Sequence, residues 1–265
     1  MLALFRKYVL SMKNIRYYIL ISFLTILLLL EAKSSSIQSL ESEIIAKSGS
    51  ANTTTTESIF KELYKDIDAA SYDLSYEAFH YAMLGYIAMV ENKALDNDEV
   101  ITIIDFTKDS CKKRFYTIDL SEKKIVFNTL VSHGKKSGSN VCTKFSDIPE
   151  SHQSSIGFYT TGNTYIGKHG KSLRLHGNER GYNANAYKRA VVIHGADYVS
   201  DNFIKSYGRL GRSFGCPALP MGEHKEIIRK IKGGSLIFAY YNDTEYLQNS
   251  QLLKEKDSKN LIATL

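Results

Sequence analysis

A cysteine lies near the end of a glycine-rich loop in the C-terminal third of the sequence. Residues 208–217 read GRLGRSFGCP, so Cys216 follows Gly215 and precedes Pro217, which cannot continue a helix. Glycine beside a nucleophile lets the backbone approach a substrate carbonyl closely, and the amides around Gly215 and Cys216 are candidates for binding an oxyanion. Cysteine is most often a small buried apolar residue, but this segment is polar. We therefore predict that Cys216 is a nucleophile.

A cysteine nucleophile needs a base or a cation beside it, because an unperturbed thiol has a pKa of about 8.5. The nearest candidates in the sequence are His194, Arg209 and Arg212. Histidine can accept the proton and return it to a leaving amine, whereas arginine can only supply charge or bind a carboxylate. A lone histidine after an apolar run such as 191–193 is more often a surface residue. With Cys216 as its partner, we assign His194 as the base and both arginines to substrate binding.

The two motifs together resemble a known family. The pair HG at 194–195, followed by SFGC at 213–216, is similar to the His-Gly and Ser-x-Gly-Cys signature of the YkuD-like L,D-transpeptidase catalytic domain. More specifically, it resembles the murein L,D-transpeptidase catalytic domain family, which places Gly-Arg before Ser-x-Gly-Cys-Pro-Ala. The likeness spans about residues 101–241, including SHGK at 132–135 and GKHG at 167–170, and reaches back to the helical segment after Ser75.

This resemblance implies a mixed β-sandwich and a covalent reaction on peptidoglycan. In that reaction Cys216 attacks an amide of a tetrapeptide stem, releases D-alanine and forms a thioester, which a diaminopimelate amine or water then resolves. By matching position, Cys216 is the nucleophile and His194 the base, Ser213 and Gly215 shape the loop and the oxyanion site, and Gly195 belongs to the substrate-binding set.

The sequence departs from the family pattern in two places. Phe214 stands where many members have a polar residue, often histidine, which argues against a second histidine in the loop. The separation of His194 and Cys216 is longer than usual in the wider family, which implies an inserted lid around Phe203. Two alternative functions stay open: an L,D-carboxypeptidase, in which water resolves the thioester, and a non-catalytic cell-wall-binding module.

Glycine-rich segments before His194 supply further candidates for the substrate site. His176 precedes Gly177, a pattern that suits either a binding residue or a plain turn residue. We place Tyr159, Tyr165 and His176 in the substrate-binding set, with Lys168 and His169 as neighbours that could line the cleft. The other histidines are expected to be structural or solvated: His80, His133, His152 and His224.

A zinc site is the rival within enzymes, because His169, His176, His194 and Cys216 are all suitable ligand types. Their spacing matches no compact ligand pattern, and the sequence contains no H-E-x-x-H or C-x-x-C motif. We therefore predict neither a metal nor any other cofactor.

Two periodicities predict the elements that position these residues. Apolar residues recur at helical spacing over 59–67 and again after Ser75, whose hydroxyl suits an N-cap. Segments rich in Ile, Val, Phe and Thr then predict strands at 101–106, 115–120, 124–131, 156–160, 172–175, 190–194 and 235–241.

Two more helices are expected near the end of the chain. One covers 200–207, and the other covers about 222–232, buries Ile227, Ile228 and Ile231, and ends at Gly233. Strands dominate and the helices are few, so the sequence predicts an α+β, β-rich fold with an N-terminal helical extension.

The N-terminus has the layout of a signal peptide, with basic residues before an apolar run at 17–30. The run is shorter than the roughly 20 residues that cross a bilayer, but no clean cleavage site follows, so an uncleaved anchor is the alternative. We expect an exported protein of the periplasm or cell envelope. The predicted divisions are a signal peptide or anchor at 1–32, a Ser/Thr-rich linker at 33–57, the helical extension at 58–98, the catalytic domain at 99–243 and a polar, frayed tail at 244–265.

Charge and cysteine content limit the partners. The formal net charge is +6 over 265 residues, but Lys and Arg are scattered, without the interleaved aromatic residues of a nucleic-acid surface. We expect a monomer that binds peptidoglycan stems, no nucleic acid, and a membrane only through an uncleaved N-terminus. A disulfide between Cys111 and Cys142 would leave Cys216 free in an oxidising compartment.

Overall fold

The computed structural model describes residues 56–254. The predicted signal or anchor segment, nearly all of the linker and the last residues of the tail lie outside this range. Within it, no helix is long and apolar enough to cross a membrane.

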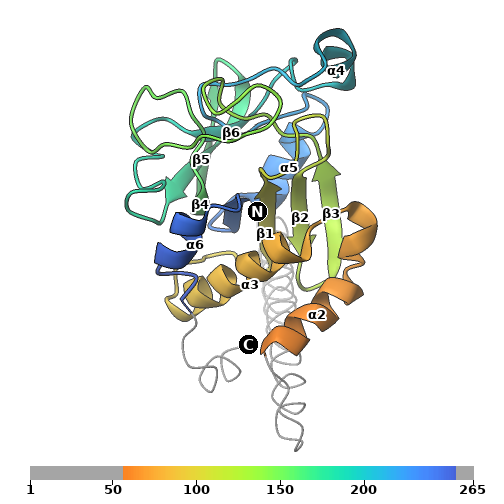
Figure 1. Ribbon diagram of the computed structural model, residues 1–265, viewed down its shortest axis with the longest axis vertical. Helices are drawn as coiled ribbons and strands as arrows, with labels where there is room; N and C mark the ends of the chain where they lie inside the picture. The colour runs from red at the N-terminus through yellow and green to blue at the C-terminus, as the bar shows by residue number, and fades with distance from the viewer. Residues whose placement is uncertain (1–55, 255–265) are drawn as a thin grey trace, which may run out of the picture. The chain divides into compact units, whose positions relative to one another are not determined.

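The strands of the described range join in one mixed sheet (Figure 1). They are β1 (Val100–Asp105), β2 (Phe115–Asp119), β3 (Lys124–Thr129), β4 (Gly157–Gly167), β5 (Gly170–Gly177), β6 (Val192–Gly195), β7 (Ala218–Leu219) and β8 (Leu236–Tyr240). Their order across the sheet is β3-β2-β1-β8-β4-β5-β6-β7. The first three are antiparallel neighbours, whereas β1 runs parallel to β8 and β6 runs parallel to β7. The α+β, β-rich class is therefore confirmed.

The helices that the sequence predicts are present. Ser75 starts one of them, because its Oγ accepts a hydrogen bond from the Ala78 amide at 3.2 Å. Ser200 starts another in the same way, with its Oγ accepting from the Phe203 amide at 3.3 Å. The helical elements are α2 (Thr56–Asp66), the 3-10 turn η1 (Ala69–Tyr72), α3 (Tyr76–Glu91), α4 (Asp201–Tyr207), α5 (His224–Ile231) and α6 (Thr244–Asn249).

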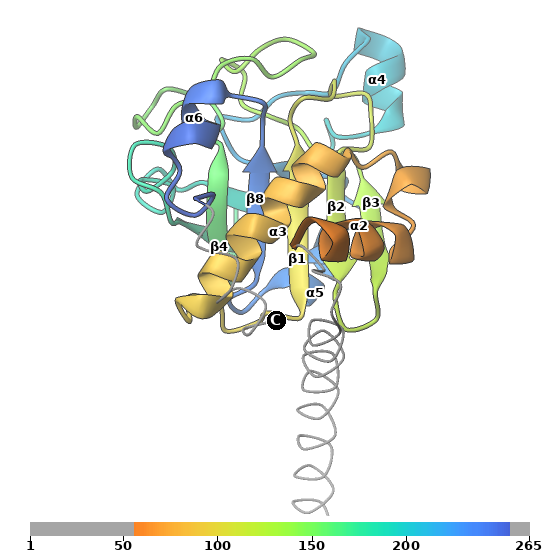
Figure 2. The same cartoon turned by 60° about the horizontal axis from the view of Figure 1, so that its bottom comes forward.

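Helices α3 and α5 cover opposite faces of the sheet (Figure 2). On the α5 side, Ile227, Ile228 and Ile231 join one hydrophobic core with Leu173 and Ile193 of β5 and β6. Side chains alternate between the two faces along a strand, so the residues next to Leu173 and Ile193 point to the other face. The face opposite to α5 therefore receives Arg174, Val192 and His194.

The C-terminal tail differs from the prediction. Helix α6 packs on the domain, and Tyr246 is completely buried. Its hydroxyl donates to Glu179 Oε2 at 2.9 Å, and Ser250 Oγ donates to the other oxygen of the same carboxylate. The Phe158 amide also donates to Glu179, at 2.8 Å. The tail was predicted to fray because its composition is polar, but its described part is anchored by one buried carboxylate.

Candidate active site

The base predicted from the sequence lies at the end of a short inner strand. In β6, Ile193 enters the core, so His194 points to the opposite face, where it pairs with Ser172 of β5. Its side chain is 3% exposed, and its Nδ1 lies 2.9 Å from the Gly195 carbonyl. A carbonyl oxygen only accepts, so Nδ1 carries the hydrogen and Nε2 keeps a free lone pair. Burial lowers the pKa of His194, and so do the charges of His169, His224 and Lys168. His194 is therefore a neutral imidazole that can accept a proton at Nε2.

The nucleophile loop, residues 208–217, is braced by Ser213. The Ser213 hydroxyl donates to the Cys216 carbonyl at 2.6 Å and accepts from the Gly215 amide at 3.0 Å. Gly215 has φ +124, and a Cβ there would lie 2.6 Å from the Gln153 carbonyl, so only glycine fits. The Gly215 amide, one of the two predicted oxyanion donors, is thus already bonded to Ser213.

The sheet aligns His194 with the short strand that follows Cys216. Strand β7 pairs in parallel with β6, with Ala218 beside His194, so Cys216 lies just before β7. The Val192 amide donates to the Cys216 sulfur, which in turn lies 3.7 Å from the Ala190 carbonyl. No hydrogen bond joins the thiol and the imidazole within residues 56–254.

The thiol is protonated in this arrangement. Burial raises the pKa of Cys216, while the Val192 amide and the charges of Arg189 and Lys168 lower it. The Lys168 ammonium lowers the pKa of His194 as well, so it acts on both reacting groups. The shifts favour the neutral form of both groups, the thiol of Cys216 and the imidazole of His194.

A buried arginine and histidine support the nucleophile loop from behind. His133 is fully buried, and its carbonyl accepts from the Ser213 amide at 3.0 Å. Its Nδ1 accepts from Arg114 Nη2 at 2.8 Å, and burial together with that guanidinium lowers the pKa of His133 to about 3. Arg114 also donates to the Val131 and Lys108 carbonyls. His133 is structural, as predicted, but its link to the loop had no signal in the sequence.

Both loop arginines bind backbone oxygens. Arg209 Nη1 donates to the Leu210 carbonyl at 2.7 Å, and Arg212 Nη1 donates to the Gly138 carbonyl at 2.9 Å. Burial lowers the pKa of Arg212, and the nearby charge of Arg209 adds to this. Arg209 thus binds within its own loop, and Arg212 ties the loop to the segment that contains Gly138. Their role in substrate binding stays a prediction.

Tyr159 was wrongly placed in the substrate site. It is 3% exposed in the core on the α5 side of the sheet, opposite to His194, and its hydroxyl donates to the Ser155 carbonyl at 3.0 Å. The alternation of β4 sends this side chain inward. The prediction rested on the glycine-rich segments around this residue. Such segments do not indicate which face of the sheet a side chain occupies.

The other predicted binding residues stay on the His194 side. The turn between β4 and β5 brings the exposed ring of His169 onto His194, with ring centroids 4.4 Å apart and an interplanar angle of 23°. His176 stacks on Tyr187 at 5.0 Å, and the Arg174 guanidinium lies 4.6 Å from the Tyr165 ring. Tyr187 and Arg174 are the residues of this surface that sequence reasoning missed.

One exposed aromatic side chain, Phe214, lies two residues before Cys216 in the loop. Phe214 is 63% exposed, with its ring 4.5 Å from that of His152 and 4.3 Å from the Lys135 ammonium. An exposed aromatic ring thus stands at the position where the family often has a polar residue.

The three cysteines differ in their surroundings. Cys111, Cys142 and Cys216 are all free thiols, so the predicted disulfide is wrong. Cys142 is buried in the core, where burial raises its pKa to about 12, while the Cys111 sulfur donates to the Gly208 carbonyl at 3.4 Å. In residues 56–254, no group of three or more His, Cys, Asp or Glu side chains could hold a metal ion.

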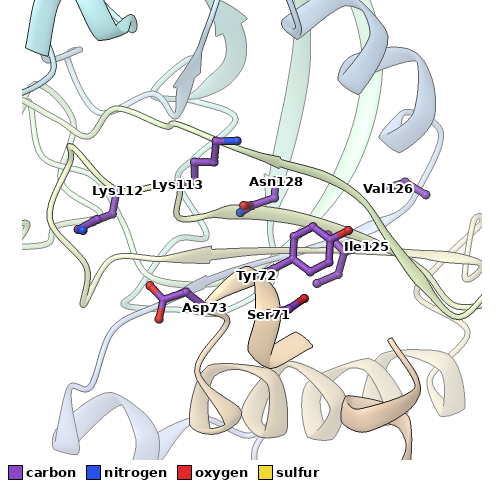
Figure 3. Close-up of a pocket in the computed structure, with 8 residues that line it drawn as sticks. All are labelled: Ser71, Tyr72, Asp73, Lys112, Lys113, Ile125, Val126 and Asn128. Carbon is purple, nitrogen blue, oxygen red and sulfur yellow. The ribbon is translucent and has the colours of Figure 1, made fainter. Parts of the chain in front are cut away.

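An open hollow of about 440 Å³ lies elsewhere, between η1 and β3 (Figure 3). Its walls contain neither histidine nor cysteine, so it cannot supply the chemistry described above. The lining residues are Ser71, Tyr72, Asp73, Lys112, Lys113, Ile125, Val126 and Asn128.

Comparisons with known proteins agree with the motifs. Solved structures similar to this chain include an L,D-transpeptidase from Mycobacterium smegmatis, at 13% identity and a TM-score of 0.34, covering 54% of this chain and 59% of that one. The helical cell shape determining protein Pgp2 from Campylobacter jejuni is 13% identical with a TM-score of 0.38, covering 60% of this chain and 57% of that one. L,D-transpeptidase 3 from Mycobacterium tuberculosis is 11% identical with a TM-score of 0.33, covering 54% of this chain and 61% of that one.

The match therefore spans about three-fifths of the length of each of these structures. A search of curated proteins gives no match. A family model of the L,D-transpeptidase catalytic domain matches residues 70–240, which is well over half of the sequence. The chain belongs to the L,D-transpeptidase catalytic domain family.

Proposed function

We propose that this protein is a cysteine acyltransferase acting on peptidoglycan tetrapeptide stems. The observation that carries the proposal is the parallel pairing of β6 and β7, which aligns His194 with Ala218, two residues after Cys216. Family membership supports the choice of substrate, because the family is that of L,D-transpeptidase catalytic domains.

The proposed reaction begins with proton transfer. The Cys216 thiol turns from the Ala190 carbonyl toward His194, and its proton passes to Nε2. The thiolate adds to the carbonyl carbon of the scissile amide, and the Cys216 amide donates to the new oxyanion. The carbon–nitrogen bond then breaks, the imidazolium returns its proton to the leaving D-alanine amine, and a thioester remains.

A second stem completes the reaction. Its side-chain amine loses a proton to His194 Nε2 and attacks the thioester, forming a new amide as the carbon–sulfur bond breaks. The sulfur then regains the proton from the imidazolium. The bond from Nδ1 to the Gly195 carbonyl keeps the same ring nitrogen free in both halves of the cycle.

The envelope is the proposed location, because peptidoglycan lies there. The N-terminal segment is proposed to direct export, either as a cleaved signal or as an anchor, and the catalytic domain is proposed to act as a monomer. Fractionation of cells that express the full chain, followed by N-terminal sequencing, tests this part.

Covalent labelling tests the chemistry. Incubation with a carbapenem, followed by intact-protein mass spectrometry, is expected to give one adduct on Cys216 and none in Cys216→Ala. Cys111→Ala is the matched control, since it removes the other partly exposed thiol and should keep the adduct. An unmodified wild type would reject the proposal in favour of a binding module.

Product analysis then identifies the acceptor. Incubation of the protein with disaccharide tetrapeptide is expected to yield crosslinked dimers and free D-alanine. Tripeptides without dimers would instead assign the L,D-carboxypeptidase reaction.

A further inference from the structure

A second polar cluster lies on the sheet face that bears His194. We call it the arginine cluster; it comprises Tyr165, Arg174, His176 and Tyr187. The Arg174 guanidinium lies 4.6 Å from the Tyr165 ring centroid and 5.3 Å from that of Tyr187. Tyr187 in turn stacks on His176, at 5.0 Å and 14°. The guanidinium is therefore held against two aromatic rings.

Arg174 has no hydrogen bond or ion pair with any residue of 56–254. Arg189 shows the opposite behaviour: its side chain is 3% exposed and donates to the Ser146 and Gln153 carbonyls, both at 2.7 Å. An arginine that stacks on rings keeps its N–H donors in the guanidinium plane, and these match the two oxygens of a carboxylate. The donors of Arg174 are thus available to a ligand.

The strand register joins this cluster to the nucleophile. Arg174 on β5 pairs directly with Val192 on β6, and the Val192 amide donates to the Cys216 sulfur. Ser172, two residues earlier on β5, pairs with His194. The step from β5 across β6 to β7 covers two strand spacings, about 10 Å between backbones. One extended peptide of a few residues is long enough to reach from Arg174 to Cys216.

A bulge in β4 makes room for the cluster. The register with β5 shifts between Thr161 and Thr164, so two β4 residues oppose Arg174 instead of one. One of these is Gly162, and a Cβ there would lie 2.6 Å from His176 Nε2 and 3.5 Å from the Arg174 Cβ. The missing side chain lets the imidazole lie flat against its neighbours.

We propose that Arg174 binds a free carboxylate of the donor stem and thereby selects stems in which that carboxylate is not amidated. This inference rests on the proposed function for its substrate. Tyr165 and Tyr187 hold the guanidinium plane, and His176 supports Tyr187. Arg209 and Arg212, the arginines predicted from the sequence, instead donate to the backbone carbonyls of Leu210 and Gly138.

Binding is measured without turnover, by calorimetric titration of Cys216→Ala. The probes are disaccharide tetrapeptide with free carboxylates, the same molecule with a C-terminal carboxamide, and the same molecule with a diaminopimelate carboxamide. Adding Arg174→Gln is expected to raise the Kd for the free probe about 10- to 100-fold, the loss typical of a charged hydrogen-bonded pair. One of the two amidated probes should bind Cys216→Ala as weakly as the free probe binds the variant that also carries Arg174→Gln. Adding Arg174→Gln should not weaken the binding of that amidated probe further.

Arg229→Gln is the matched control, because Arg229 lies on α5, on the opposite face, in an exposed pair with Glu226. It should leave all three affinities unchanged. Equal affinity with and without Arg174, equal affinity for all three probes, or no measurable binding of any stem would each overturn the inference. Arg174-dependent binding without carbapenem labelling of the wild type would reject the proposed reaction but leave the carboxylate site standing.

Discussion

The nucleophile loop and the β4–β5 hairpin both contain arginines, but they use them in opposite ways. Behind and within the loop, Arg114, Arg209 and Arg212 donate to backbone carbonyls. On the hairpin, the Arg174 guanidinium lies over two aromatic rings and has no hydrogen bond or ion pair within the described part of the chain. A polar group satisfied within the protein supports the fold, whereas a charged group left without a partner at the surface is available to a ligand. This difference distinguishes arginines that stabilise the fold from an arginine that is free to bind a ligand.

Replacing one arginine of each kind is expected to give the largest difference in stability. Arg114→Met should lower the free energy of unfolding by about 3–5 kcal/mol, because two carbonyls and His133 Nδ1 lose their buried donor. Arg174→Met should cost less than about 1 kcal/mol, the value of an exposed cation–π contact. Chemical denaturation measures both. Similar losses from the two variants would contradict the division.

The support behind the loop should also appear in the pH dependence of stability. The folded pKa of His133 is about 3, below its unfolded value of about 6.5, so the unfolded chain binds the extra proton between these values. The free energy of unfolding should therefore fall as pH drops below about 6.5, by about 2 kcal/mol from this residue at pH 5. Denaturation of wild type and His133→Asn across pH 5–8 measures the difference, and identical slopes would count against it.

The geometry of the arginine cluster gives a smaller effect. Gly162→Ala should displace the His176 imidazole from Tyr187, at a cost of about 1–2 kcal/mol in stability, with weaker binding of the free tetrapeptide. Gly222→Ala is the matched control, since a Cβ there meets nothing within 4 Å. Thermal unfolding and titration measure both variants. Unchanged stem binding in Gly162→Ala would separate His176 from the cluster.

The smallest effect is expected from a loop arginine. Arg212→Ala removes a half-buried donor to the Gly138 carbonyl and should cost about 1 kcal/mol in stability. It should leave the ratio of affinities for free and amidated stems unchanged. Thermal unfolding and the same titrations measure the two quantities. A changed ratio would return Arg212 to the substrate site.

Much of the fold was predictable because single elements have local signals. The spacing of Ile227, Ile228 and Ile231 predicts the buried face of α5, and Ser75 predicts the start of α3. Strand β7 has only two residues, Ala218 and Leu219, so no alternation can reveal it. Yet the pairing of this strand with β6 aligns His194 with Ala218, two residues after Cys216.

The candidate site was predictable only in part, because its support is tertiary. Cys216 and His194 stand out by residue type, but the donors of Arg114 and Arg174 depend on which strands pair. The disulfide prediction failed for a similar reason, since counting cysteines cannot show that Cys142 is enclosed in the core. Whether a polar residue stabilises the fold or binds a ligand depends on the sheet face that it occupies and on its hydrogen-bond partners. Both are set only when the strands pair.

The buried carboxylate under α6 has a consequence for where this domain ends. Burial raises the pKa of Glu179, and two of the groups that donate to it, Tyr246 and Ser250, lie beyond the last residue of the family match. A protein trimmed to residues 70–240 would retain the Phe158 amide as a donor but lose these two hydroxyls. The carboxylate of Glu179 would then lack two of its hydrogen-bond donors. The C-terminal segment thus covers the buried carboxylate. Its removal is expected to disturb β4, which pairs with β5, the strand that bears Arg174.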